Sequence, residues 1–502
     1  MALIFYKNLK KHKKTTEKNI TFSVFGEGVI SNEDYLISKP NECKVFHNFT
    51  LTDGSLKTGL GFKDLEVPSN RTSVDGWHTF DLEEAGITAI KDITMFRYRD
   101  STNDIYYYHL YLVSQEDEVW YCLLIDTTGG SVINKSTTKV TDLISVIKYR
   151  VEGSDCLMYY IPTGMLYLTG YGRAFYQEVP AFLSCVVHYG KVFGITNTNR
   201  NELVYTDNLD IRNWQDDSGI VIEFLDDRGM FEKLVSFNDY VYLFRENGIT
   251  KISEYSNIDE FSFDHLYTSS SKIYEKSVCV CGEEVFFVTR DGLYSFNGSR
   301  VQKICEEYDN YFQNLDNMNC SSCCLDGKYY LATKFDFDDN LTVGCESATS
   351  YTNNVLFEVD INTQKVDVLR GVDIKKIISV DTPFYSKVVA CFNGTYCGHL
   401  GELVHSGKLF TENLPKSWSS FTTDLGYKGK NKKIKEIILN TSTSVDVEII
   451  SDVETKTYSF EGSEKEQRCM ASVNGKNFQF IFKTTKAECH ISKPMIVFDV
   501  IS

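Results

Sequence analysis

The sequence predicts an all-β protein, a six- or seven-bladed β-propeller followed by a C-terminal antiparallel β-sandwich. The chain of 502 residues is rich in aromatic residues, with 33 Phe and 31 Tyr, and contains only 7 Pro. Aromatic and β-branched side chains suit the pleated, half-buried surface of a strand. From about Thr88 to Phe410, a short apolar strand, a polar turn and another strand recur roughly every 35 to 50 residues. Helical patterns are nearly absent, and Glu306–Leu315 is the best short candidate.

Turn signals separate the strands within this repeated region. The dipeptides that tolerate the positive φ angles of tight hairpins are Asn247-Gly248, Asp291-Gly292, Asn297-Gly298, Asp326-Gly327 and Asn393-Gly394. One small antiparallel sheet cannot bury both of its faces, whereas several such sheets around an axis can. We therefore expect a propeller over residues 87–412. A string of β-sandwiches is the alternative, but no linker interrupts this region.

The regions on either side of the propeller have different patterns. Residues 416–502 contain evenly spaced alternating strands without helical segments, which predicts an antiparallel sandwich that folds independently. Residues 19–86 contain strand-like pieces and loops, and one interpretation is that they supply an edge strand that closes the ring. Residues 1–18 form a Lys-rich arm.

The charge of the chain is strongly uneven. The formal net charge is −17, and residues 1–18 carry six Lys against one Glu, so the remaining chain carries −22. Such an acidic body repels nucleic acid, and we expect no tight nucleic-acid binding. We expect the arm to dock onto a partner through the residues Lys7, Lys10, Lys11, Lys13, Lys14 and Lys18.

Neither a membrane segment nor an export signal is recognisable. No run approaches the roughly 18 to 20 apolar residues that a membrane helix needs, and the N-terminus has its apolar residues before the basic ones, opposite to a secretory signal. The 15 cysteines are scattered, and we expect mostly reduced thiols. The close cluster of Cys320, Cys323 and Cys324 lacks the second pair that a zinc site requires.

The patterns that carry catalysis or metal binding are not found. Residues 426–430 have the wrong spacing for a phosphate-binding loop. Residues 335–340 superficially resemble a calcium loop, but Leu341 and Ser347 stand where glycine and glutamate are needed. Asp207 and Trp214 resemble an Asp-box turn, with too long a spacing. We therefore expect no enzyme activity, cofactor or metal.

A short N-terminal phrase, NFTLTDGSLKTGLGF (48–62), resembles a phrase near the start of the propeller proteins of phage virions. The residues that carry the resemblance are Asp53, Gly54, Leu56, Lys57, Gly61 and Phe62. The pair Gly59-Leu60 departs from the Arg-Pro expected there. Three further segments are similar to that family: Trp214 followed by residues 220–224, the phrase DGLYSFNG at 291–298, and the ending ISKPMIVFDV at 491–500.

The resemblance implies a virion structural protein of short-tailed phages, a tail hub or nozzle ring component on the DNA exit path. It further implies a homo-oligomeric ring, with six-fold order favoured, and other tail or portal-adaptor proteins as partners. The protein would be made in the host bacterial cytoplasm and assembled into the virion tail. Two alternatives are a carbohydrate-binding or sialidase-like propeller and a cytosolic propeller that binds other proteins.

Overall fold

The structure is a computed structural model that falls into two compact units. Residues 1–60 with 413–502 form the first, called here the sandwich unit, and residues 61–412 form the second, the propeller unit. The residues described are 17–23, 43–68, 77–79, 82–83, 86–100, 105–123, 133–139, 145–151, 154–161, 164–169, 174–177, 182–206, 222–224, 226–253, 261–313, 315–337, 339, 341–383 and 386–501.

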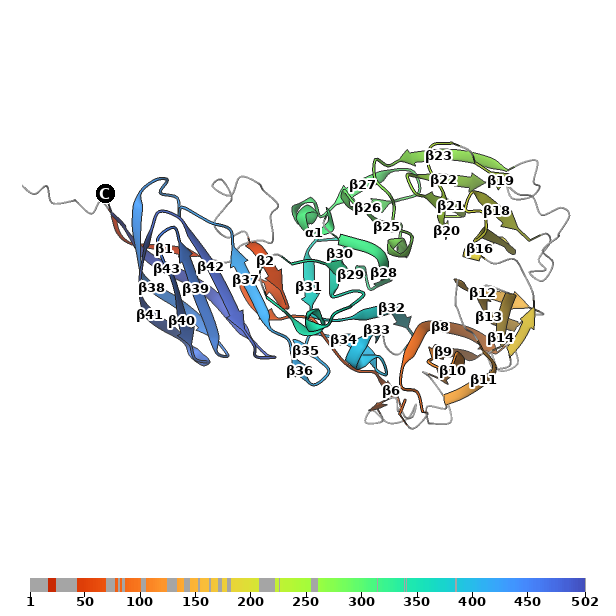
Figure 1. The fold of residues 1–502 in the computed structure, drawn as a ribbon, viewed down its shortest axis with the longest axis horizontal. Coiled ribbons are helices and arrows are strands. Elements are labelled where there is room, and N and C mark those ends of the chain that lie inside the picture. Colours follow the sequence, from red (N-terminus) through yellow and green to blue (C-terminus); the bar gives the residue numbers. More distant parts are fainter. Residues whose placement is uncertain are drawn as a thin grey trace, which may run out of the picture. The chain divides into compact units, whose positions relative to one another are not determined.

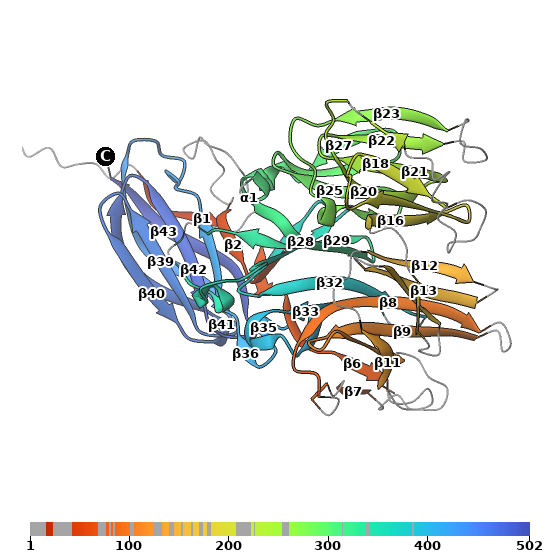
Figure 2. The same ribbon diagram turned by 45° about the vertical axis from the view of Figure 1, so that its right-hand side comes forward.

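In the part of the chain that is described, the propeller unit contains six four-stranded antiparallel blades and a seventh blade whose sheet has six strands (Figures 1 and 2). The first blade consists of β8 (Ile90–Asp100), β9 (Ile105–Ser114), β10 (Glu118–Leu123) and β11 (Ile133–Lys139), and the second of β12 (Ser145–Val151), β13 (Ser154–Ile161), β14 (Gly164–Thr169) and β15 (Ala174–Gln177). The third consists of β16 (Phe182–His188), β17 (Lys191–Thr196), β18 (Glu202–Tyr205) and β19 (Ile222–Glu223), and the fourth of β20 (Phe231–Phe237), β21 (Tyr240–Arg245), β22 (Gly248–Ser253) and β23 (Ser262–Thr268). The fifth consists of β24 (Cys279–Cys281), β25 (Glu284–Thr289), β26 (Gly292–Phe296) and β27 (Val301–Ile304), and the sixth of β28 (Leu315–Leu325), β29 (Lys328–Phe335), β30 (Val355–Asp360) and β31 (Val366–Arg370).

Aromatic side chains fill the space between neighbouring blades, which explains their abundance. Between the fourth and fifth blades, the rings of Phe244 and Phe287 lie 5.6 Å apart, and those of Tyr242 and Phe296 lie 5.0 Å apart. Both pairs are edge-to-face, the arrangement that the ring quadrupoles prefer. Because a blade is covered on both faces, its central strands are continuously apolar. The two-residue turn Asp326-Gly327, with φ of 51° and 72°, joins β28 to β29 as the dipeptide predicts.

The seventh blade is completed by a strand from the other end of the chain. Its sheet runs β32 (Ile374–Asp381), β33 (Ser386–Phe392), β34 (Leu400–Val404) and then β5 (Gly61–Asp64), followed by the short β35 (Lys408–Leu409) and β36 (Glu412–Asn413). The closing strand packs tightly: a Cβ on Gly61 would lie 2.3 Å from the carbonyl oxygen of Lys408. Phe62 is fully buried, with its ring 5.1 Å from that of Phe392. Residues 61–64 therefore close the ring.

The sandwich unit takes strands from both ends of the chain. One sheet runs β3 (Phe49–Thr52), β4 (Ser55–Thr58), β43 (His490–Ile501), β38 (Asn431–Thr441) and β41 (Ser463–Gly475), with β1 (Glu17–Ser23) also on β43; the other runs β2 (Cys43–His47), β37 (Lys416–Ser420), β42 (Phe478–Thr484), β39 (Val445–Ser451) and β40 (Thr455–Phe460). Residues 416–502 thus share both sheets with N-terminal strands. Residues 19–86 are divided between the two units, because β1–β4 join the sandwich and β5 joins the propeller.

The remaining elements are short. The strands β6 (Glu66–Pro68) and β7 (Trp77–Thr79) form a two-stranded sheet. The helix expected at Glu306–Leu315 is present as a 3-10 turn over Glu306–Tyr308 and α1 (Asp309–Gln313). Other 3-10 turns are η2 (Glu275–Ser277), η4 (Gly344–Ser347) and η5 (Gly394–Tyr396). Within the described ranges, no helix has the length and apolar character needed to cross a membrane.

Replacing Phe62 with alanine tests whether β5 holds the ring closed. We expect Phe62→Ala to lower the free energy of unfolding of the propeller unit by about 3–5 kcal/mol, because it leaves a cavity against Phe392. Urea unfolding of the full chain measures this. Met318→Ala is the control, since 74% of that side chain is exposed in the same unit. Equal stability of Phe62→Ala and the unchanged chain would contradict the role of β5.

Candidate functional site

The innermost strands of the propeller enclose a cavity of about 1110 Å³. Its described lining comes from β8, β16, β20, β24, β28 and β32, the first strands of six different blades, and from the turn η2. Since the first strand of each blade is the one nearest the propeller axis, the cavity lies at the centre of the ring. A volume near 1000 Å³ is at the upper end of the range for binding sites of small molecules.

The charge of the lining is opposite in sign to that of the chain. The basic residues among the described lining are Lys91, Arg97, Lys233, Lys276, Lys375 and Lys376, and the acidic ones are Asp92, Glu232, Glu275 and Asp381. The excess is therefore of positive groups, although the chain as a whole carries −17.

Three of the four carboxylates already have partners. Asp92 is paired with Lys376 across the seventh and first blades. Asp381 accepts a hydrogen bond of 2.7 Å from the Ser386 hydroxyl. The buried Glu232 lies 2.5 Å from the Arg200 guanidinium and 3.0 Å from the Lys272 ammonium group.

Glu275 shares a hydrogen bond with Glu232 and also attracts the cavity lysine Lys233 electrostatically. Burial raises the pKa of Glu232 above its ordinary value, and the hydrogen bond with Glu275 acts in the same direction. Lys272 and Arg200 act in the opposite direction without overcoming the burial. Burial and the neighbouring Glu275 therefore favour the protonated form of Glu232.

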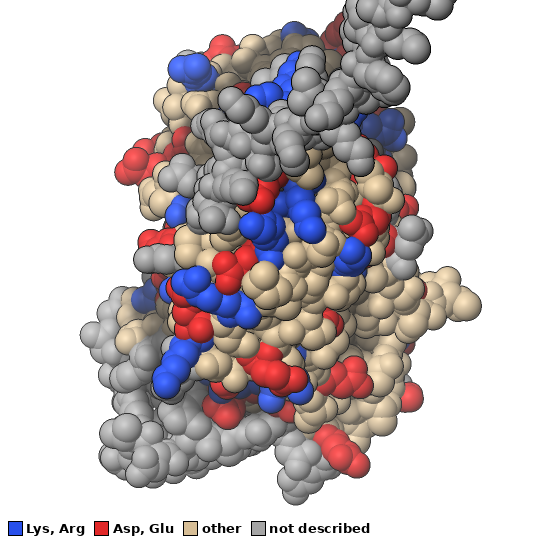
Figure 3. All heavy atoms as spheres, turned by 90° about the vertical axis from the view of Figure 1, so that its left-hand side faces the viewer, with Lys and Arg blue, Asp and Glu red and all other residues tan. Residues whose placement is uncertain are grey.

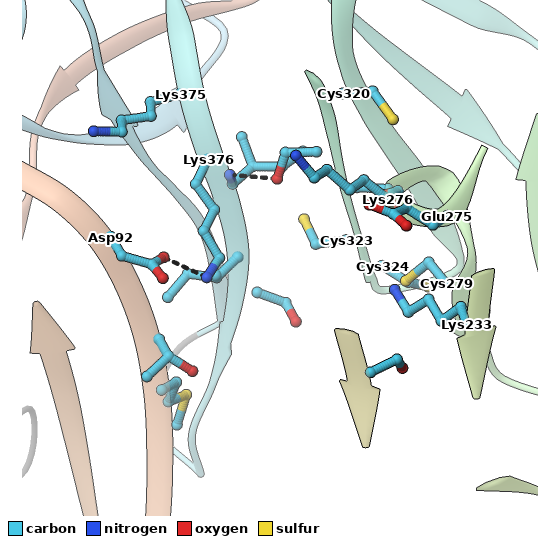
Figure 4. Close-up of a pocket in the computed structure, with 18 of the residues that line it drawn as sticks. Asp92, Lys233, Glu275, Lys276, Cys279, Cys320, Cys323, Cys324, Lys375 and Lys376 are labelled. Atoms are coloured by element: carbon cyan, nitrogen blue, oxygen red, sulfur yellow. Dashed lines mark hydrogen bonds and ion pairs between the residues drawn. The ribbon is translucent and has the colours of Figure 1, made fainter. Parts of the chain in front are cut away.

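Three lysines of the lining make no direct ion pair with a described carboxylate, and one of them, Lys375, donates a hydrogen bond of 3.4 Å to the carbonyl oxygen of Ile90. The Lys233 ammonium group donates a hydrogen bond of 2.9 Å to the carbonyl oxygen of Val278, and burial lowers the pKa of Lys233 below its ordinary value. Lys276, at the turn η2, extends into the cavity (Figure 4), and its backbone carbonyl accepts a hydrogen bond of 2.9 Å from Ser322. Lys233 lies in β20, the first strand of the fourth blade, and Lys276 lies in the turn that precedes the fifth blade.

Buried thiols form part of the same wall (Figure 4). Burial raises the pKa of Cys279 to about 11 and that of Cys320 to about 12, and it raises the pKa of Cys323 well above its ordinary value. The thiols are therefore protonated and weakly nucleophilic at neutral pH. In the residues that the structure describes, no group of three or more His, Cys, Asp or Glu side chains could hold a metal ion.

One disulfide joins Cys281 in β24 to Cys324 in β28 and so links the fifth and sixth blades. Ten other described cysteines are free. The cluster at 320–324, which the sequence presents as one group, is thus divided: Cys324 is bonded across the blades, while Cys320 and Cys323 are buried thiols.

The structure gives the calcium-like segment a different role. Asp339 is one of two carboxylates that bind the buried guanidinium of Arg370, at 2.6 Å, and Glu346 is the other, at 2.8 Å. The ring of Phe337 lies under the same guanidinium, 3.7 Å away. The segment is therefore a loop anchored by an internal ion pair, and not simply a solvated turn.

The Lys-rich arm and the Asp-box-like pair fall largely outside the part of the chain that the structure describes. The arm residues Lys7, Lys10, Lys11, Lys13 and Lys14 lie outside the described residues, as do Asp207 and Trp214. Lys18 belongs to β1, which pairs with β43, but its side chain is outside the description. The arm therefore ends where β1 begins, at Glu17.

Sequence reasoning missed the central cavity. The signal was present: Lys233 lies in the otherwise apolar strand β20, and Lys375 and Lys376 lie in the apolar strand β32. A lysine inside a mostly buried strand is unusual, because its charge must be solvated or paired. Lysines of this kind in the first strand of a blade are therefore a sequence signal for a polar cavity at the propeller axis.

Comparisons with known proteins give no assignment of family. No family model and no curated protein matches the chain. Among solved structures, the chain is similar to BamB from Moraxella catarrhalis (8% identity, 71% of this chain, 93% of that chain, TM-score 0.37) and to the Cps50 (Swd1) β-propeller domain of Myceliophteria thermophila (11%, 63%, 98%, 0.39). It is also similar to YCF48 bound to a D1 peptide (12%, 68%, 94%, 0.38). Likenesses this weak carry no functional argument, and the fold rests on the sheet order.

Removing the Arg370 guanidinium should strongly destabilise the sixth blade. Arg370→Met would leave the mostly buried carboxylates of Asp339 and Glu346 without their cation, at a cost of about 3–5 kcal/mol in the free energy of unfolding. Chemical denaturation of the full chain measures the loss. Arg300→Met is the matched control, because Arg300 is exposed and makes no ion pair with a described residue. Equal effects of the two substitutions would contradict the anchoring role.

Proposed function

We propose that this chain is a non-catalytic structural subunit of a tailed-phage particle, a tail hub or nozzle ring component on the DNA exit path. The observation that carries the proposal concerns the two phrases, at 48–62 and 491–500, that resemble virion propeller proteins. They lie at opposite ends of the sequence, yet they pair directly in one sheet. Leu56 of β4 is opposite Ile491 of β43, with Ser55 opposite Ser492.

Five of the six residues that carry the resemblance of the N-terminal phrase have a structural task, which supports a resemblance of frameworks. Asp53 and Gly54, with φ of 52° and 69°, form the turn between β3 and β4. Leu56 is fully buried in the sandwich unit, and Phe62 is fully buried in the propeller unit. Gly61 begins the strand that closes the ring. The phrase thus specifies the passage of the chain from one unit to the other.

Charge supports a role beside DNA without tight binding. On the face shown in Figure 3, basic and acidic side chains lie interspersed. On the sandwich unit, for example, Lys435 pairs with Asp499 and Lys483 pairs with Glu448. A surface of this kind, on a chain of net charge −17, holds few phosphates by counterion release, so a duplex could pass it freely. The cavity of about 1110 Å³ has the size of a ligand site, so the proposed conduit is the ring formed by several copies.

Quantitative mass spectrometry of density-purified particles tests the proposal. We expect the chain in DNA-containing particles at a constant ratio to the portal protein, in several copies per particle. A soluble host protein of similar abundance in the lysate serves as the control for carry-over. A chain that is found in the lysate but is absent from mature particles would refute the structural role.

Deleting residues 1–16 tests the docking arm separately. This deletion removes five of the six lysines and leaves β1 intact, because the strand begins at Glu17. We expect an unchanged thermal unfolding temperature and loss of incorporation into particles, since the basic arm is attracted to acidic neighbours. Replacing the five lysines with arginine keeps the charge and should keep incorporation. Normal incorporation of the deleted chain would refute the arm but not the virion role.

A further inference from the structure

We propose that the central cavity of the propeller is a binding site for a small multivalent oxyanion of the phosphate class, such as a polyphosphate or a phosphorylated metabolite. The proposal goes beyond the virion role and does not depend on it. It rests on three features of the cavity: its unneutralised lysines, its neutral hydrogen-bond donors, and its size and polarity.

The lysines supply an excess of positive charge, since the described lining holds six basic side chains against four acidic ones. Neither Lys233 nor Lys276 makes a direct ion pair with a described residue, and Glu275 attracts Lys233 electrostatically without bonding to it. Figure 4 shows Lys276 extending from the turn η2 into the cavity, whereas Lys376 is directed to Asp92. Removing an ammonium group from water is costly unless an anion is close. A bound anion would relieve this cost at Lys233, where the pKa is already lowered by burial.

Two serine hydroxyls supply neutral donors in the same lining. Ser184 accepts a hydrogen bond of 3.2 Å from the backbone N–H of Leu234, and Ser321 accepts one of 3.1 Å from that of Ile377. Each hydroxyl also carries one O–H donor. Neither donor is used within the described residues, so both hydroxyls can donate to a ligand oxygen. The two serines belong to different blades, the third and the sixth.

The kind of donor favours phosphate over carboxylate. Lysine acts as a point charge with three rotatable donors and is a common phosphate ligand, whereas the flat fork of arginine matches a carboxylate. The one arginine of the lining, Arg97, has its guanidinium 3.9 Å above the ring of Tyr106. Lysines and hydroxyls placed around an axis suit an anion with oxygens in several directions. An apolar ligand would find charged groups in the wall, and a duplex would not fit.

Calorimetric titration of the purified full-length chain with sodium tripolyphosphate tests the site. We expect Lys276→Gln and Lys233→Met each to weaken binding by at least about tenfold, the factor for one lost hydrogen bond to a charged group. Lys251→Gln is the matched control, because it removes the same charge from blade four, where Lys251 pairs with Asp264. Lys276 is exposed, so its variant should fold normally even if Lys233→Met does not.

A second measurement locates the ligand. Lysines of the full chain are acetylated with and without tripolyphosphate, and peptide mass spectrometry should show protection of Lys276 but not of Lys251. Hexaglutamate is titrated in parallel as an acidic peptide of similar charge. The proposal is overturned if the chain gives no binding at millimolar tripolyphosphate, if all three variants lose affinity equally, or if hexaglutamate binds at the cavity more tightly than tripolyphosphate.

Discussion

The pairing of β5 with β34 is the constraint on which the rest of the propeller depends. A propeller ring is closed only if the chain links its first and last blades. Here residues 61–64, which precede the first blade, supply the fourth strand of the seventh blade. Gly61 permits the close approach of β35, and Phe62 fills the space against Phe392. Without this strand, the edge of β34 would present unpaired backbone groups.

The sandwich unit is held by the same principle. The strand β43, near the C-terminus, lies between β4 and β38 and also pairs with β1. Both units therefore need strands from the two ends of the chain, and the chain passes between them at residues 60–61 and 412–413. Contacts so distant in sequence form only after large loops have closed, which makes folding slow. Once formed, they hold β1–β5 and β43 in their sheets.

The distribution of charge links the fold to a possible ligand. Buried ion pairs such as that of Arg370 with Asp339 and Glu346 are complete, so they serve the fold. In the central cavity, by contrast, Lys233 in the first strand β20 and Lys276 in the turn η2 make no direct ion pair with a described carboxylate. The same framework that closes the ring brings these groups together. A rigid scaffold with an unbalanced charge at its axis is the basis of a binding site.

Local sequence patterns predict the β class, the repeated strands, the turn at Asp326-Gly327 and the short helix near residue 309, because each depends on neighbouring residues. Long-range strand pairing, by contrast, sets the seven blades of the described chain, places β1–β4 in the sandwich and brings Cys281 to Cys324. It also brings lysines of separate blades to one cavity. The physical reason is that alternation and turn chemistry are local, whereas strand pairing, ring closure and the meeting of distant side chains depend on long-range register that no short pattern encodes.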